Sequence, residues 1–253
     1  MIVADLLEEL RVGILRDSSS LTSGSDDQLW SDARLVAYIH QGQVRFAKRT
    51  LSLRDNTTPA VTQVTLVAGQ SEYPTHMAVL STLSARYDTD TVNMPRASAE
   101  RLDRSGSTES LYFDVNTAST LAPGRPITWA TDQAARTFRV YPTPSAAEAG
   151  KIIRLRVARL PINTLSTLDL YASPEIPEEY HYDILEYAAY KALSNHDADA
   201  GSNAVDATQL TPAEKHKANF ETAIKEALQE SKREMFAPAF WDFTAMPGVA
   251  YSR

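Results

Sequence analysis

The stretch GRPITWATDQAARTFRVYPTP, residues 124–144, contains two short segments in which apolar and polar side chains alternate. One segment surrounds Trp129, the other surrounds Phe138, and a polar turn separates them. Alternation with a period of two is typical of a strand with one buried face. After a Pro-Thr-Pro sequence, KIIRLRVARLP at residues 151–161 alternates in the same way. The sequence therefore predicts a β-rich region in the middle of the chain.

Outward from this stretch, the strand pattern extends over about residues 58–161, and the turn signals recur at short intervals. Six or so short strands at such spacing predict a β-sandwich or an open barrel. One segment, MPRASAERLDR at residues 94–104, is instead compatible with a short helix that begins at its proline. The remaining predicted strands are AVTQVTLVAGQSEYP at 60–74, with a turn at Ala68-Gly69-Gln70, HMAVLSTLSARYD at 76–88, and SLYFDV at 110–115.

Helical periodicity flanks this region on both sides. Residues 2–16 and 28–51 precede it, the second with Asp26 or Asp27 as its cap. A helix led by Pro177 and a helix capped by Thr211 and Glu214 follow it. The predicted inner stripes are Val3, Leu6, Leu7, Leu10 and Ile14, with Glu8, Glu9 and Arg11 outside; Leu35, Ile39, Gly42 and Phe46; His181, Ile184, Leu185, Ala188 and Ala192; and Phe220, Ile224, Ala227 and Leu228.

These patterns predict an α+β protein with three parts. Residues 1–57 and 162–235 form an antiparallel helical bundle of about four helices, which the inserted β domain of residues 58–161 interrupts. Residues 236–253 form an extended C-terminal tail. Gly42 lies in the helical seam, where a missing side chain permits close approach of another helix.

Composition and motifs point away from catalysis. The 253 residues carry a formal net charge of -7 and no cysteine, so disulfides and thiolate chemistry are excluded. The nine glycines are too widely spaced for a phosphate-binding loop, and the five histidines form no H-x-x-x-H or H-E-x-x-H motif. His181 is expected to pack within its helix face. We therefore predict no enzymatic activity, no catalytic residue, no cofactor, no metal site and no membrane association.

Two sets of residues are candidates for binding. Arg154 and Arg156 project to one side of their strand, with Arg159 near its end, which suits a nucleic-acid face, a solvent-exposed face or a row of ion pairs between subunits. The net charge favours the solvent-exposed face or the subunit interface over nucleic acid. The last eighteen residues contain Phe236, Phe240, Trp241, Phe243 and Tyr251 among helix breakers, a density of aromatic residues that predicts docking on a partner or folding back onto the same subunit.

At this point the chain resembles the head-to-tail adaptor, or connector, proteins of tailed bacteriophages. The resemblance covers about residues 27–236. It is carried by LWSDARLVAYIHQGQVRFAKRTL at 29–51, by the stretch at 124–144 with LRVARLP after it, and by IPEEYHYDILEYAAYKAL at 176–193.

This resemblance implies a virion protein assembled in the host cytoplasm. It implies a ring of identical subunits, usually a homododecamer, which sits below the portal protein and contacts a downstream tail or nozzle protein. Double-stranded DNA passes through the ring without sequence-specific binding, and the C-terminal aromatic residues engage the portal. Two alternatives stay open: another neck or tail-completion protein, or a carbohydrate-binding or hydrolytic tail component built on the β domain.

Overall fold

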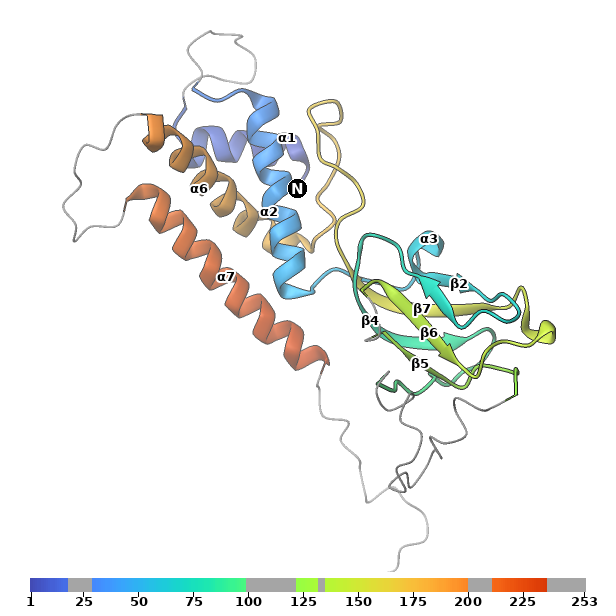
Figure 1. Cartoon of the computed structure of the whole chain (residues 1–253). Helices are drawn as coiled ribbons and strands as arrows, with labels where there is room; N and C mark the ends of the chain where they lie inside the picture. The colour runs from blue at the N-terminus through green and yellow to red at the C-terminus, as the bar shows by residue number, and fades with distance from the viewer. Residues whose placement is uncertain (18–28, 99–121, 132–134, 200–210, 236–253) are drawn as a thin grey trace, which may run out of the picture.

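The computed structural model describes residues 1–17, 29–98, 122–131, 135–199 and 211–235. Helices gather in one part of the molecule and antiparallel strands in another (Figure 1). The predicted mixed α+β class is therefore confirmed.

The N-terminal helix consists of α1 (Val3–Glu8) and the π-helical turn η1 (Glu9–Ile14) that continues it. The predicted stripe is buried through Leu10, but Arg11, expected on the outer face, is fully buried. In η1 the hydrogen bonds span five residues, as from the Leu15 amide to the Leu10 carbonyl at 2.9 Å. This wider turn changes the direction of the side chains that follow Leu10 and brings Arg11 inward, against the carboxylate of Asp17 at 2.7 Å.

Helix α2 (Asp32–Thr50) buries its predicted stripe, including Gly42. A Cβ atom on Gly42 would lie 2.9 Å from the carbonyl oxygen of Ile184, so the expected close approach exists, and its partner is another helix. The predicted start was wrong. The helix begins at Asp32 with Ser31 as its N-cap residue, so neither Asp26 nor Asp27 caps it.

The C-terminal pair of helices is α6 (His181–Asp199), preceded by the 3-10 turn η3 (Glu178–Tyr180), and α7 (Pro212–Met235). The predicted capping box of α7 is confirmed: the Thr211 amide donates to Glu214 at 3.0 Å, and the Glu214 amide donates to the Thr211 hydroxyl at 3.2 Å. One apolar core joins these helices to α2 and the N-terminal helix. Its members include Leu6, Leu10, Leu35, Ile39, Phe46, Ile184, Leu185, Ala188, Phe220 and Ile224.

The strands form two antiparallel sheets. Sheet A contains β1 (Arg54–Asp55), β2 (Gln63–Thr65), β4 (Val79–Tyr87) and β7 (Ile152–Arg159), and sheet B contains β3 (Glu72–Pro74), β5 (Thr128–Ala130) and β6 (Thr137–Tyr141). Strand β7 pairs with all three other strands of sheet A. Because β4 follows β7 along most of its length, β1 and β2 share its other edge.

Several strand predictions are confirmed and others are corrected. The strands around Trp129 and Phe138 and the strand at 152–159 are present, and Gly69 occupies its predicted turn with a φ of 76°. The segment Pro59–Thr62 is a short helix, α3, because Pro59 starts a helical turn before the strand begins. Residues 94–98 are not helical, since Met94 and Arg96 make bridges to strands. Residues 110–115 lie outside the described residues.

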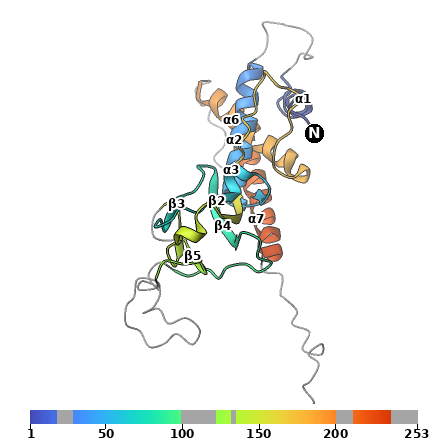
Figure 2. The same cartoon turned by 90° about the vertical axis from the view of Figure 1, so that its right-hand side faces the viewer.

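The two sheets share one buried core, to which β2, β4 and β7 contribute from sheet A and β3, β5 and β6 from sheet B. At its centre Trp129 stacks on Phe138 with 5.7 Å between ring centroids, and the indole nitrogen donates to the Met94 carbonyl at 3.0 Å. Figure 2 shows this strand-rich part below the helices, with α7 descending beside it.

Candidate functional site

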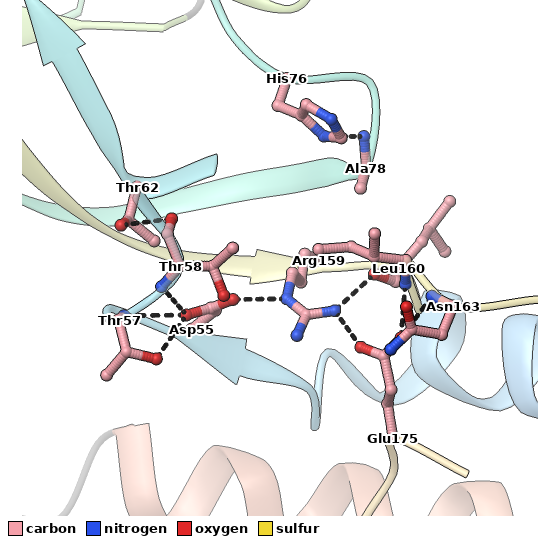
Figure 3. Close-up of polar contacts among 11 residues, drawn as sticks. Asp55, Thr57, Thr58, Thr62, His76, Ala78, Arg159, Leu160, Asn163 and Glu175 are labelled. Carbon is pink, nitrogen blue, oxygen red and sulfur yellow. Dashed lines mark hydrogen bonds and ion pairs between the residues drawn. The ribbon is translucent and has the colours of Figure 1, made fainter. Parts of the chain in front are cut away.

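Arg159, the last residue of β7, lies where the strands meet the helical part (Figure 3). Its Nε donates to Asp55 Oδ2 at 2.6 Å, and its Nη1 donates to the carboxylate of Glu175. All three side chains are largely withdrawn from solvent, with exposed fractions of 12% for Arg159, 4% for Asp55 and 14% for Glu175. We call these three residues the junction cluster.

Asp55 is held in its charged form by an array of donors. Its Oδ1 accepts hydrogen bonds from the Thr57 amide at 2.9 Å, the Thr57 hydroxyl at 3.2 Å and the Thr58 amide at 3.0 Å. Burial opposes the charge, but the hydrogen bonds from Thr57, Thr58 and Arg159 outweigh it and hold the pKa of Asp55 well below its usual range. Burial also acts against the Arg159 cation, whose pKa is nevertheless raised by its two carboxylate partners.

Glu175 connects the cluster to the helices. Its Oε1 accepts from the Ile162 amide at 2.8 Å and the Asn163 amide at 2.6 Å, and its own amide donates to Gln43 Oε1 at 2.8 Å. Gln43 is fully buried on α2. A continuous series of polar contacts therefore runs from β1 through β7 to the middle of α2.

A second contact holds the C-terminal end of α7 to sheet A. Arg54, on β1, donates from Nη2 to the Ser231 carbonyl at 3.0 Å and to the Ser231 hydroxyl at 2.9 Å. Sheet A is thus held to α2 through the junction cluster and to α7 through Arg54. Two separated anchors restrain rotation of one part against the other better than a single anchor does.

Residues 160–177, here called the strap, lead from β7 to the turn before α6 and rise beside the N-terminal helix (Figure 1). The amides of Val3 and Ala4 donate to the carbonyls of Ala172 at 2.8 Å and Leu170 at 3.0 Å. Near these contacts, Leu168 and Tyr171 are 96% and 83% exposed. The sequence reasoning missed this pair, because the connection contains several other apolar residues, such as Leu165 and Ile176, that are buried, and no local pattern separates the exposed ones from these.

The three arginines predicted together separate in the structure. Arg159 is paired within the subunit, while Arg154 and Arg156 are exposed on the face of sheet A that points away from the shared core. Arg86 joins them from β4, directly opposite Arg154 in the register of the sheet. Within the described ranges, none of these three has a carboxylate partner. We call Arg86, Arg154 and Arg156 the arginine face.

A shallow hollow of about 240 Å³ lies between these side chains, with Asn56 and Asn93 at its border. A larger hollow of about 680 Å³ lies between α6 and α7 and is lined by Tyr180, Asp183, Glu226, Glu230 and Arg233, among others. We call it the acidic groove. Burial, and then the negative charges of Glu226 and Glu186, raise the pKa of Asp183 in this groove.

The remaining sites considered from the sequence are a packed histidine and residues that lie outside the described part of the chain. His181 is buried with its Nε2 3.1 Å from the Ile176 carbonyl, and burial lowers its pKa, as expected of a packed histidine. Among the residues with described positions, no three acidic or histidine side chains converge as metal ligands would. No helix in that same set has the length and apolarity required to span a bilayer. The aromatic residues from Phe236 to Tyr251 lie beyond the last described residue.

The junction cluster and Arg54 hold the two parts to each other, and each part presents charged side chains on its surface. The model of the SU10 adaptor protein family matches residues 1–241, a span that contains both parts and the junction between them, and the chain belongs to this family. This is a phage head-tail adaptor family, so the resemblance noted in the sequence is confirmed.

Membership makes the chain a structural adaptor of a bacteriophage and a virion component that interacts with other head or tail proteins. The family is structural, not enzymatic. No curated protein matches the chain.

Proposed function

We propose that this chain is the head-to-tail adaptor subunit that forms a ring below the portal, joins capsid to tail and surrounds the path of the DNA. The observation that carries the proposal is the family match over residues 1–241, which includes the helices, both sheets and the junction cluster. A homododecamer is the ring size that we expect. The net charge of -7 suits a channel through which a polyanion slides without being held.

Within this ring we assign different roles to the two parts. The helices, taken as a four-helix antiparallel bundle, form the wall, and the two sheets, taken as a sandwich, reach toward the tail or nozzle protein. The residues from Phe236 to Tyr251 engage the portal, with Phe240 and Trp241 as anchors, because large aromatic residues dominate interface hot spots. The junction supports this division of roles because it holds the two parts in one orientation.

Co-assembly with the portal protein of the same phage, viewed by electron microscopy, tests the proposal. We expect monomers or small oligomers of the adaptor in dilute solution, and rings under the portal when both are mixed. Deletion of residues 236–253 is expected to abolish attachment and leave the melting transition unchanged. Trp241→Ala alone is expected to weaken attachment by roughly 2 kcal/mol.

The truncated protein provides its own control. If it unfolds, the aromatic residues belong to the core of the subunit; if it still joins the portal normally, the docking role is wrong. If the intact protein forms no ring under the portal and binds elsewhere in the tail, the position in the neck is wrong, although the chain remains a phage adaptor.

A further inference from the structure

The arginine face concentrates positive charge on an acidic protein. Arg86 and Arg154 face each other directly across β4 and β7, and Arg156 lies two residues farther along the same face. Like charges directly opposite in a sheet are destabilising, and no carboxylate among the described residues offsets them. The arrangement costs stability in the isolated subunit, which is expected of a surface whose partner is another molecule.

The acidic groove concentrates negative charge. Asp183, Glu226 and Glu230 line one hollow with Arg233 as the one basic side chain among its described lining residues. The Tyr180 hydroxyl donates to Glu230 at 2.8 Å, which satisfies one carboxylate but brings no positive charge. Each surface therefore presents the charge that the other needs.

We propose that the arginine face of one subunit binds the acidic groove of a second copy of this chain. The inference deepens the proposed ring and rests on it. The two surfaces belong to different parts of the molecule, sheet A and the α6–α7 pair (Figure 1). Their contact is heterologous, the type that repeats from subunit to subunit and closes into a ring when the rotation permits.

A carboxylate partner explains the arginine face better than nucleic acid does. Three arginines at this surface are few for a phosphate backbone, whose tight binding rests on many neutralised phosphates. A carboxylate accepts two parallel hydrogen bonds from one guanidinium, which fixes orientation as well as charge. Each chain carries a net charge of -7, so most orientations of two subunits bring like charges together. Such pairs favour the one orientation in which opposite charges meet.

The chain contains no cysteine, so disulfide trapping tests the contact without background from native thiols. We expect the full chain carrying both Arg156→Cys and Glu226→Cys to form a ladder of covalent trimers and larger species on mild oxidation. Each variant with a single cysteine is expected to stop at dimers, because one cysteine forms one disulfide. The matched control carries Arg156→Cys and Lys48→Cys, since Lys48 is exposed on α2 away from the acidic groove. Equal ladders from the control and the test protein would overturn the proposal.

A second experiment reverses the charge of the arginine face. Arg86→Glu with Arg154→Glu, placed in the trapping protein, is expected to slow ladder formation by about tenfold or more, because like charges across an interface suppress association. Lys48→Glu with Lys215→Glu makes the same change in net charge at exposed positions and is expected to have little effect.

Mixing two charge-altered variants tests whether opposite charges attract at this contact or whether any added negative charge simply slows association. One protein carries Arg86→Glu and Arg154→Glu with Arg156→Cys, and the other carries Glu230→Lys with Glu226→Cys. We expect these proteins to cross-link to each other, because the reversed face of the first carries acids beside its cysteine and the altered groove of the second carries a lysine beside its own. The first protein is expected to cross-link less to a protein that carries Glu226→Cys in an otherwise unchanged groove. Failure of the mixture to cross-link would overturn the assignment of the groove.

Three further outcomes distinguish the possible failures. If the arginine reversals abolish binding to double-stranded DNA and leave trapping intact, the arginine face binds nucleic acid and the proposal falls. If rings form under the portal but the test protein traps no better than its control, the proposed function stands and this contact is wrong. If trapping succeeds and no ring forms at the portal, the contact is right and the proposed position in the neck is wrong.

Discussion

The end and the middle of one strand, β7, place chemically identical side chains in opposite circumstances. Arg159, at its end, is nearly buried between Asp55 and Glu175, whereas Arg154 and Arg156, in its middle, face solvent and have no carboxylate partner in the part of the chain that the structure describes. A residue's type and spacing do not determine its role; the groups that the fold brings to it do. The end of β7 stabilises the subunit, and its middle is available to another molecule.

Arg159→Met should produce the largest change in this comparison. It leaves the Asp55 carboxylate, which is 4% exposed, without its cation, and breaking a buried pair costs roughly 3 kcal/mol or more. The free energy of unfolding is measured by urea denaturation. Arg156→Met, the same change three residues earlier on the exposed face, is the control and should shift it by less than about 0.5 kcal/mol. Equal losses in both proteins would erase the distinction between the end and the middle of β7.

Asp55→Asn should have a smaller effect that depends on pH. At about pH 7 it removes charge-assisted hydrogen bonds and lowers the free energy of unfolding by roughly 2 kcal/mol. Because the fold lowers the pKa of Asp55, its contribution is complete above the ordinary aspartate value of about 4 and is lost as the pH falls below that value.

The gap in stability between wild type and Asp55→Asn should therefore narrow on acidification, as followed by denaturation at a series of pH values. Asp90→Asn, which removes a more exposed carboxylate paired with Arg125, is the control and should cost less than about 1 kcal/mol. A gap that stays constant down to about pH 2 would show that Asp55 is not held in its charged form.

Arg86→Gln combined with Arg154→Gln should produce the smallest change. Removing two like charges that face each other across strands should leave the free energy of unfolding unchanged or raise it by a few tenths of a kcal/mol. Thermal melting of the two-site variant beside wild type measures this effect. A loss of more than about 1 kcal/mol would place these arginines inside the subunit's own network.

The sequence predicted those features whose signal is local. Alternation around Trp129 and Phe138 located two strands, and the Thr211 and Glu214 pair located the start of α7, because capping is decided within four residues. The helical stripe through Gly42 also predicted a close helix neighbour, since few other uses justify a glycine inside a buried seam.

Other features depend on contacts that no local pattern encodes. Asp55 and Arg159 are separated by 104 residues, so their pairing became visible only when β1 lay beside β7. A 3.6-residue period predicts Arg11 on the outer face, but the helix widens into a π turn at Glu9–Ile14 and buries it. The segment after Met94 has helix-compatible residues, but its backbone hydrogen bonds go to neighbouring strands.

The strap gives the molecule a mechanical property. It leaves the sheet next to Arg159, is held near its far end by Glu175, and lies along the N-terminal helix through the carbonyls of Leu170 and Ala172. A pull on the sheets thus loads the junction ion pairs and the amide contacts of Val3 and Ala4 together, as shear along the strap. Tension from one end of an assembly would be carried into the helices through these parallel connections, without first opening a hinge between the two parts.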